Sequence, residues 1–206
     1  MKRTLSGLLL LLSTSVSWAG SSPTMPATAP PLPAESHASF LWAVDVETGT
    51  LWRASNNTVL DYTIVPIIIS LRTPAHARMD LGPGELTLRA RFSLLADAIV
   101  EGPESAYLGF SASPSLEYWF TKGGPSCLYA SAGGGFGWID STSVPGGQGQ
   151  DFTLNWFAAA GIRHYLQPRF SIHAGAQFQH WSNGGATDPN PGVDALGPVI
   201  GATWHF

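Results

Sequence analysis

Residues 85–98 read ELTLRARFSLLADA, and apolar and polar side chains alternate along most of this stretch. The even-numbered positions are all apolar: Leu86, Leu88, Ala90, Phe92, Leu94, Ala96 and Ala98. The odd-numbered positions are mostly polar or charged: Glu85, Thr87, Arg89, Arg91, Ser93 and Asp97. Successive side chains of a β-strand point to opposite faces, so a period of two is the signature of a strand. The stretch predicts a long strand with one apolar face and one face carrying charges of both signs.

The same alternation recurs along the chain. A second apolar set is Phe152, Leu154, Trp156, Ala158, Ala160 and Ile162, and a third is Leu196, Pro198, Ile200, Ala202, Trp204 and Phe206. Segments of this kind, separated by turn residues, predict eight strands. Their approximate ranges are 38–51, 57–72, 84–100, 104–120, 125–140, 151–166, 168–183 and 193–206. No segment has the spacing of an amphipathic helix, and no apolar run reaches the ~20 residues of a transmembrane helix.

Two arrangements fit such strands: a soluble barrel or sandwich with its apolar face inward, and a membrane barrel with that face outward. Strands of well over ten residues are long enough to cross a bilayer at a tilt. Aromatic side chains gather near strand ends, as they do at membrane interfaces: Trp119, Phe120, Trp156, Trp181, Trp204 and Phe206. The sequence therefore favours an all-β fold, an eight-stranded antiparallel transmembrane β-barrel that crosses the bacterial outer membrane repeatedly.

Composition and the N-terminus agree with export. Charged residues make up only 12% of the chain, about half the share of an ordinary soluble domain. The chain has 10 Lys and Arg against 14 Asp and Glu, so it lacks the excess of positive charge that is typical of proteins that bind nucleic acids. Residues 1–19 have the charged start, short apolar run and small residues of a signal peptide. We expect residues 20–37, rich in proline, to form a periplasmic tether, and residues 38–206 to form the barrel.

Three side chains near one end of the predicted barrel suggest chemistry. If both termini are periplasmic and the number of strands is even, the connections 141–150 and 184–192 lie on the outer side of the membrane. His180 and Ser182 then share a face close to the outer rim, about 6–7 Å apart along the strand. Asp194 begins the neighbouring strand on the same outward face. Hydroxyl, imidazole and carboxylate are the parts of a serine hydrolase, although polar residues at this depth are also compatible with simple contact with lipid headgroups.

A longer motif surrounds these residues. His180-Trp181-Ser182-Asn183, then Asn190-Pro191-Gly192, then Asp194, resembles the lipid A 3-O-deacylase family. That family consists of eight-stranded outer-membrane barrels that remove the ester-linked 3-acyl chain of lipid A. The resemblance implies that His180 is the general base and Ser182 the nucleophile, and that Asp194 replaces the family's usual Glu. It also implies that Asn190 helps to stabilise the oxyanion, with Asn183 as a second polar support.

The expected partner is therefore lipid A, or whole lipopolysaccharide, in the outer leaflet of the membrane. No cofactor is implied, and no metal, because His164, His173 and His205 lack the spacing of metal ligands. Two other readings stay open: a structural or adhesive barrel without catalytic activity, and an esterase of the same mechanism that acts on other lipids. The sequence also leaves open whether the barrel forms a homodimer.

Overall fold

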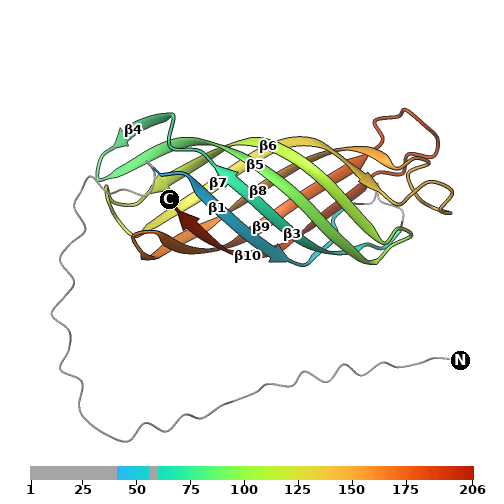
Figure 1. The fold of residues 1–206 in the computed structure, drawn as a ribbon, viewed down its shortest axis with the longest axis horizontal. Coiled ribbons are helices and arrows are strands. Elements are labelled where there is room, and N and C mark those ends of the chain that lie inside the picture. Colours follow the sequence, from blue (N-terminus) through green and yellow to red (C-terminus); the bar gives the residue numbers. More distant parts are fainter. Residues whose placement is uncertain (1–40, 56–59) are drawn as a thin grey trace, which may run out of the picture. The chain divides into compact units, whose positions relative to one another are not determined.

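The computed structural model describes residues 41–55 and 60–206; the predicted signal peptide and tether lie outside these residues. The described chain forms ten strand segments (Figure 1). Their bounds are β1 Ala43–Gly49, β2 Leu51–Arg53, β3 Thr63–Arg72, β4 Ala77–Leu81, β5 Gly84–Glu101, β6 Ala106–Trp119, β7 Ser126–Ile139, β8 Phe152–Gln167, β9 Phe170–Ser182 and β10 Val193–His205. No helix among the described residues is long and apolar enough to cross a membrane.

The sheet closes on itself. Strand β1 pairs antiparallel with β3 on one side and with β10 on the other, so the first and last strands meet. Strand β2 continues β1 beyond Thr50 and also pairs with β10 and β3. With β1 and β2 counted as one interrupted strand, and β4 outside the ring, eight antiparallel strands make a closed barrel. This confirms the predicted fold, and closure leaves no strand edge unpaired in lipid.

The two ends of the barrel differ. One end, here called the loop end, carries the connections 102–105, 140–151 and 183–192, and the opposite turn end carries 120–125 and 168–169 (Figure 1). Strand β4 pairs only with β5 and extends a hairpin at the turn end, with all five of its residues exposed. The sequence analysis did not predict β4, because five exposed residues are too few to establish a period of two.

The outward face of the barrel is apolar. Leu94 and Ile200 keep more than 60% of their surface exposed, and Trp156 and Trp204 keep about half. Arg91 and Asp97, by contrast, point inward and are nearly fully buried. Large apolar side chains exposed around a closed barrel are stable in hydrocarbon and not in water. The predicted orientation, with apolar residues facing lipid and charged residues inside, is therefore correct.

Ion pairs fill one part of the inside of the barrel, and a cluster of buried apolar side chains that includes Tyr107 and Trp181 fills another part. Eight charged or ionisable side chains, none more than 4% exposed, form the ion-paired part: Asp45, Glu47, Arg72, Arg89, Arg91, Glu117, Arg163 and His173. The Nε of Arg72 lies 2.9 Å from a carboxylate oxygen of Asp45, and Arg91 binds Glu47. Pairing of this kind offsets the cost of burying charged groups.

Glu117 is the centre of this network, and its removal should weaken the barrel. It is fully buried, pairs with Arg72, and lies 3.7 Å from Arg89 and 4.0 Å from Arg163. Glu117→Ala leaves three guanidinium groups short of a counter-charge, so the free energy of unfolding should fall by about 3–5 kcal/mol. Urea unfolding of the barrel refolded in detergent micelles measures this loss. Glu101→Ala, on the exposed rim, should change stability by less than about 0.5 kcal/mol; equal stability of the two variants would contradict the prediction.

Candidate active site

The end of β9 is oriented by a buried aromatic stack. Trp181 points into the barrel, is fully buried, and stacks on Tyr107 with ring centroids 4.5 Å apart. Because side chains alternate along a strand, this anchor turns His180 and Ser182 outward, where both are half-buried. The inward tryptophan thus fixes the face on which the two polar residues lie.

His180 and Asp194 are joined directly. They are opposite each other in the register of β9 and β10, and His180 Nδ1 lies 2.7 Å from Asp194 Oδ1. The shorter Asp side chain therefore reaches the imidazole without the extra methylene of Glu. The bond uses Nδ1, which leaves Nε2 of a neutral imidazole as the proton acceptor. On the other side of β9, Trp156 lies opposite His180, with ring centroids 5.8 Å apart.

Ser182 lies two residues beyond His180, on the same face of β9, and is opposite Leu154 of β8. Among the described residues, no hydrogen bond joins Ser182 Oγ to His180. Hydrogen bonds between a nucleophile and its base are often formed only in the substrate complex, so this geometry is compatible with a catalytic pair. The structure thus brings His180 and Asp194 into contact and places Ser182 next to them.

The two asparagines differ in their surroundings. Asn183 is buried, and its Nδ2 donates to the carbonyl groups of Gln148 at 2.5 Å and Thr187 at 2.7 Å, while its Oδ1 accepts from Gly185 N at 2.8 Å. Its amide is therefore occupied in holding two loops together. Asn190 is exposed, and its Oδ1 accepts the backbone N–H of Asn183 at 2.9 Å, which leaves its Nδ2 group pointing away from that bond.

Because of this difference, we expect replacement of the two asparagines to have different effects on stability and activity. Asn183→Ala leaves buried carbonyl groups unpaired and should lower the free energy of unfolding by about 1–3 kcal/mol, with loss of activity as the loops loosen. Asn190→Ala removes one partly exposed acceptor and should lower the free energy of unfolding by no more than about 1 kcal/mol, and kcat should fall by about 10²-fold if Asn190 is the oxyanion donor. Urea unfolding and kinetic assays of both variants measure the two effects, and a reversed pattern would refute the assignment.

One contact at the site was not predicted from the sequence. Ser55 follows β2, and its hydroxyl donates a hydrogen bond to Asp194 Oδ2. The backbone of the same segment is fixed there, because Ala54 N donates to the carbonyl oxygen of Asp194 at 2.8 Å. Ser55 and Asp194 are 139 positions apart and meet only because the first and last strands pair. The motif around His180 gives no signal for this contact.

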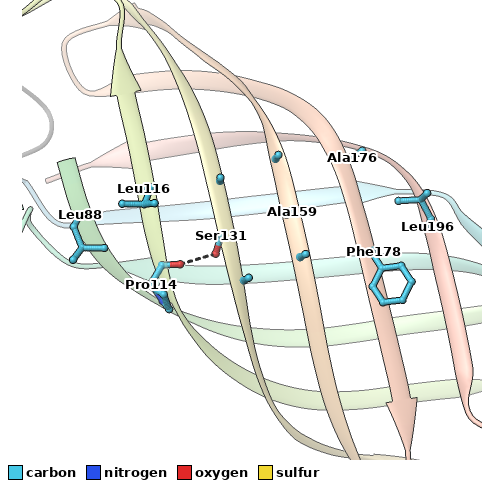
Figure 2. Close-up of a pocket in the computed structure, with 12 residues that line it drawn as sticks. Leu88, Pro114, Leu116, Ser131, Ala159, Ala176, Phe178 and Leu196 are labelled. Carbon is cyan, nitrogen blue, oxygen red and sulfur yellow. Dashed lines mark hydrogen bonds between the residues drawn. The ribbon is translucent and has the colours of Figure 1, made fainter. Parts of the chain in front are cut away.

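An apolar depression lies on the outward surface beside the site (Figure 2). Alanines form its floor: Ala130, Ala132, Ala158, Ala160 and Ala176. Leu88, Leu116, Phe178 and Leu196 project around it. Phe178 precedes His180 by two residues and packs on Trp156 at 4.7 Å between ring centroids, so the depression begins next to the imidazole. It then extends across β8, β7 and β6 to β5. Its surface is suited to a hydrocarbon chain.

No group of three His, Cys, Asp or Glu side chains in residues 41–55 and 60–206 is placed to hold a metal ion. The site therefore consists of an imidazole–carboxylate pair, a neighbouring hydroxyl and a primary amide, all at the loop end and beside an apolar surface. These are the functional groups that a hydrolase needs to act on an ester at a membrane interface.

Comparison with known proteins agrees with this description. The chain is similar to the crystal structure of the outer membrane enzyme PagL, with a TM-score of 0.55, 17% identity, and coverage of 77% of this chain and 97% of that chain. Neisserial surface protein A gives a TM-score of 0.49 at 13% identity, covering 80% of this chain and 97% of that one. Among curated proteins no match is found. The model of the family described as lipid A 3-O-deacylase (PagL) matches residues 38–203, as the motif around His180 predicted, and the chain therefore belongs to this family of outer-membrane ester hydrolases.

Proposed function

We propose that this barrel removes the ester-linked 3-acyl chain of lipid A by a serine-esterase mechanism, with Ser182 as nucleophile, His180 as general base and Asp194 as the orienting acid. The observation that carries the proposal is the 2.7 Å hydrogen bond between His180 Nδ1 and Asp194 Oδ1 on the lipid-facing side of the barrel. A carboxylate that holds an imidazole in this way stabilises the imidazolium formed when the serine loses its proton.

The proposed reaction has an acylation step and a deacylation step. Ser182 Oγ attacks the ester carbonyl carbon while its proton passes to His180 Nε2. The carbonyl oxygen becomes an oxyanion, which Asn190 Nδ2 stabilises by a hydrogen bond. The bond between the carbonyl carbon and the sugar oxygen then breaks, and His180 returns the proton to that oxygen. Water, activated by the same imidazole, releases the fatty acid from Ser182.

The substrate reaches the site from the membrane. His180 and Ser182 lie on the outward face at the loop end, which we assign to the outer leaflet, where lipid A would diffuse laterally to them. The acyl chain would lie along the alanine-floored depression that starts at Phe178. Apolar surface that is removed from contact with water or headgroups stabilises such an arrangement by about 25 cal/mol per Å².

The purified barrel, refolded in detergent micelles, tests the proposal with lipid A that carries its 3-acyl chains. Mass spectrometry should show the loss of one ester-linked 3-hydroxyacyl chain and the appearance of the free acid. The same lipid A with this chain already removed should remain unchanged, since no susceptible ester is left at that position.

Two results would redirect the assignment. Release of fatty acid from phospholipid micelles, with lipid A intact, would keep the mechanism and change the substrate. A correctly folded barrel that leaves both lipids intact would indicate a structural barrel without this activity. The folded state is checked in each case by the altered electrophoretic migration of an unheated barrel.

A further inference from the structure

The carboxylate of Asp194 is held at both of its oxygen atoms. His180 Nδ1 binds Oδ1 at 2.7 Å, and the Ser55 hydroxyl donates to Oδ2. The carboxylate is also mostly buried, with 14% of the side chain exposed. Water therefore has limited access to replace either partner.

A second partner changes how the carboxylate behaves. The terminal torsion of an Asp side chain is broad, because rotation about the bond between sp³ and sp² carbon atoms has only a low barrier. A hydrogen bond to one oxygen does not by itself stop this rotation. A donor on Oδ2 limits that rotation and keeps Oδ1 directed at Nδ1. Hydrogen bonds to an ionised group are also stronger than those between neutral groups.

The position of Ser55 is fixed by the backbone. Arg53 of β2 pairs with Ala195 of β10, and the next residue, Ala54, donates its N–H to the Asp194 carbonyl at 2.8 Å. Ser55 follows directly, so main-chain pairing up to Ala54 brings its hydroxyl to the carboxylate. The first strand of the barrel thus contributes to a site that otherwise belongs to β9, β10 and the loop between them.

We propose that Ser55 is a positioning residue of the catalytic centre, which holds the Asp194 carboxylate in the orientation that binds His180. The inference rests on the proposed esterase mechanism and assigns Ser55 no contact with substrate. The shorter side chain at position 194 makes such a restraint valuable, because a small rotation of the carboxylate breaks the contact with the imidazole. Loss of geometry at this pair lowers kcat and leaves binding of the lipid unchanged.

The test measures kcat and KM for Ser55→Ala, with lipid A in mixed detergent micelles as substrate. We expect kcat to fall roughly ten-fold, as for loss of one hydrogen bond to a charged group, with KM within about two-fold of the wild type. Ser55→Thr keeps the hydroxyl and should restore most of the activity. Because the mostly buried carboxylate loses a partner, the free energy of unfolding should fall and the urea midpoint with it, and kcat is therefore referred to the amount of folded barrel. A residue that only supports the fold would leave kcat per folded barrel unchanged.

A matched control is available at the same rim. Ser105 Oγ donates to Asp140 Oδ2 at the loop end, so Ser105→Ala removes the same kind of bond away from His180 and should keep full activity. If Ser55→Ala does not assemble, Ser55→Cys keeps the side chain's size with a weaker donor and takes its place.

The outcomes separate the two proposals. If the wild type releases the 3-acyl chain and Ser55→Ala matches its kcat, the inference about Ser55 is wrong and the esterase stands. The inference is equally overturned if Ser105→Ala loses as much activity as Ser55→Ala, or if Ser55→Thr fails to recover. If the wild type itself leaves lipid A intact, it is the esterase proposal that fails.

Discussion

Ser182→Ala is expected to give a correctly folded barrel whose kcat is roughly 10⁶-fold below that of the wild type. The substitution removes the only atom that can attack the ester in the proposed mechanism, and neither His180 nor Asp194 can replace it. Ser182 is half-buried at the end of β9, so an alanine fits without strain. Mass spectrometry after long incubation with lipid A measures the residual rate, and the unheated electrophoretic migration confirms folding.

The barrel offers a matched control for this experiment. Ser126 Oγ lies 2.8 Å from His164 Nδ1, so half-buried Ser126 and exposed His164 form a second serine–histidine pair at the turn end. No carboxylate contact is seen for His164 among the described residues, so this pair lacks the orienting acid. Ser126→Ala should therefore keep full activity. Loss of activity in Ser126→Ala, with Ser182→Ala active, would move the catalytic centre to the opposite end of the barrel.

Asp194→Asn should lower kcat by about 10⁴-fold while the barrel stays folded. An amide at this position can donate a hydrogen bond to His180 Nδ1, which moves the imidazole proton to Nε2. The nitrogen that should accept the serine proton is then blocked. The charge that stabilises the imidazolium is lost as well. Rates measured with lipid A in mixed micelles, beside the wild type, give the size of the effect.

Asp140, a carboxylate at the rim but outside the site, provides a control for the loss of a negative charge. Asp140 accepts hydrogen bonds from the backbone N–H groups of Ser105 at 2.9 Å and Ala106 at 3.0 Å, and Asp140→Asn should leave kcat unchanged. Asp194→Glu restores the acid that is usual in the family and should recover most of the activity lost in Asp194→Asn. Full activity in Asp194→Asn would show that His180 needs no orienting acid in this protein.

Much of this architecture is predictable from the sequence because one physical condition applies to every strand. Most outward residues face hydrocarbon, so one face of segments such as β5 and β10 is apolar over nearly its whole length, and the ends of these strands fall within one residue of the prediction. The same alternation places His180 and Ser182 on one face, and the hairpin between β9 and β10 brings Asp194 opposite His180.

The features that the sequence did not reveal depend on contacts across long separations or on short exposed segments. Ser55 reaches Asp194 only through pairing of the first and last strands, which no local pattern encodes. The amide of Asn183 is occupied by the carbonyl of Gln148, on a loop 35 positions earlier. A contact between two irregular loops has no periodic signature, so the structural role of Asn183 could not be separated from a role at the oxyanion.

The packed centre of the barrel has a consequence for the cell that makes it. Side chains such as Arg72, Arg89 and Glu117 are at most 1% exposed, so water has no continuous passage through the described barrel at their level. Many copies of this chain could therefore accumulate in the outer membrane without admitting ions, nutrients or hydrophilic antibiotics. The cell could remodel its surface glycolipid at high enzyme density and keep its permeability barrier intact.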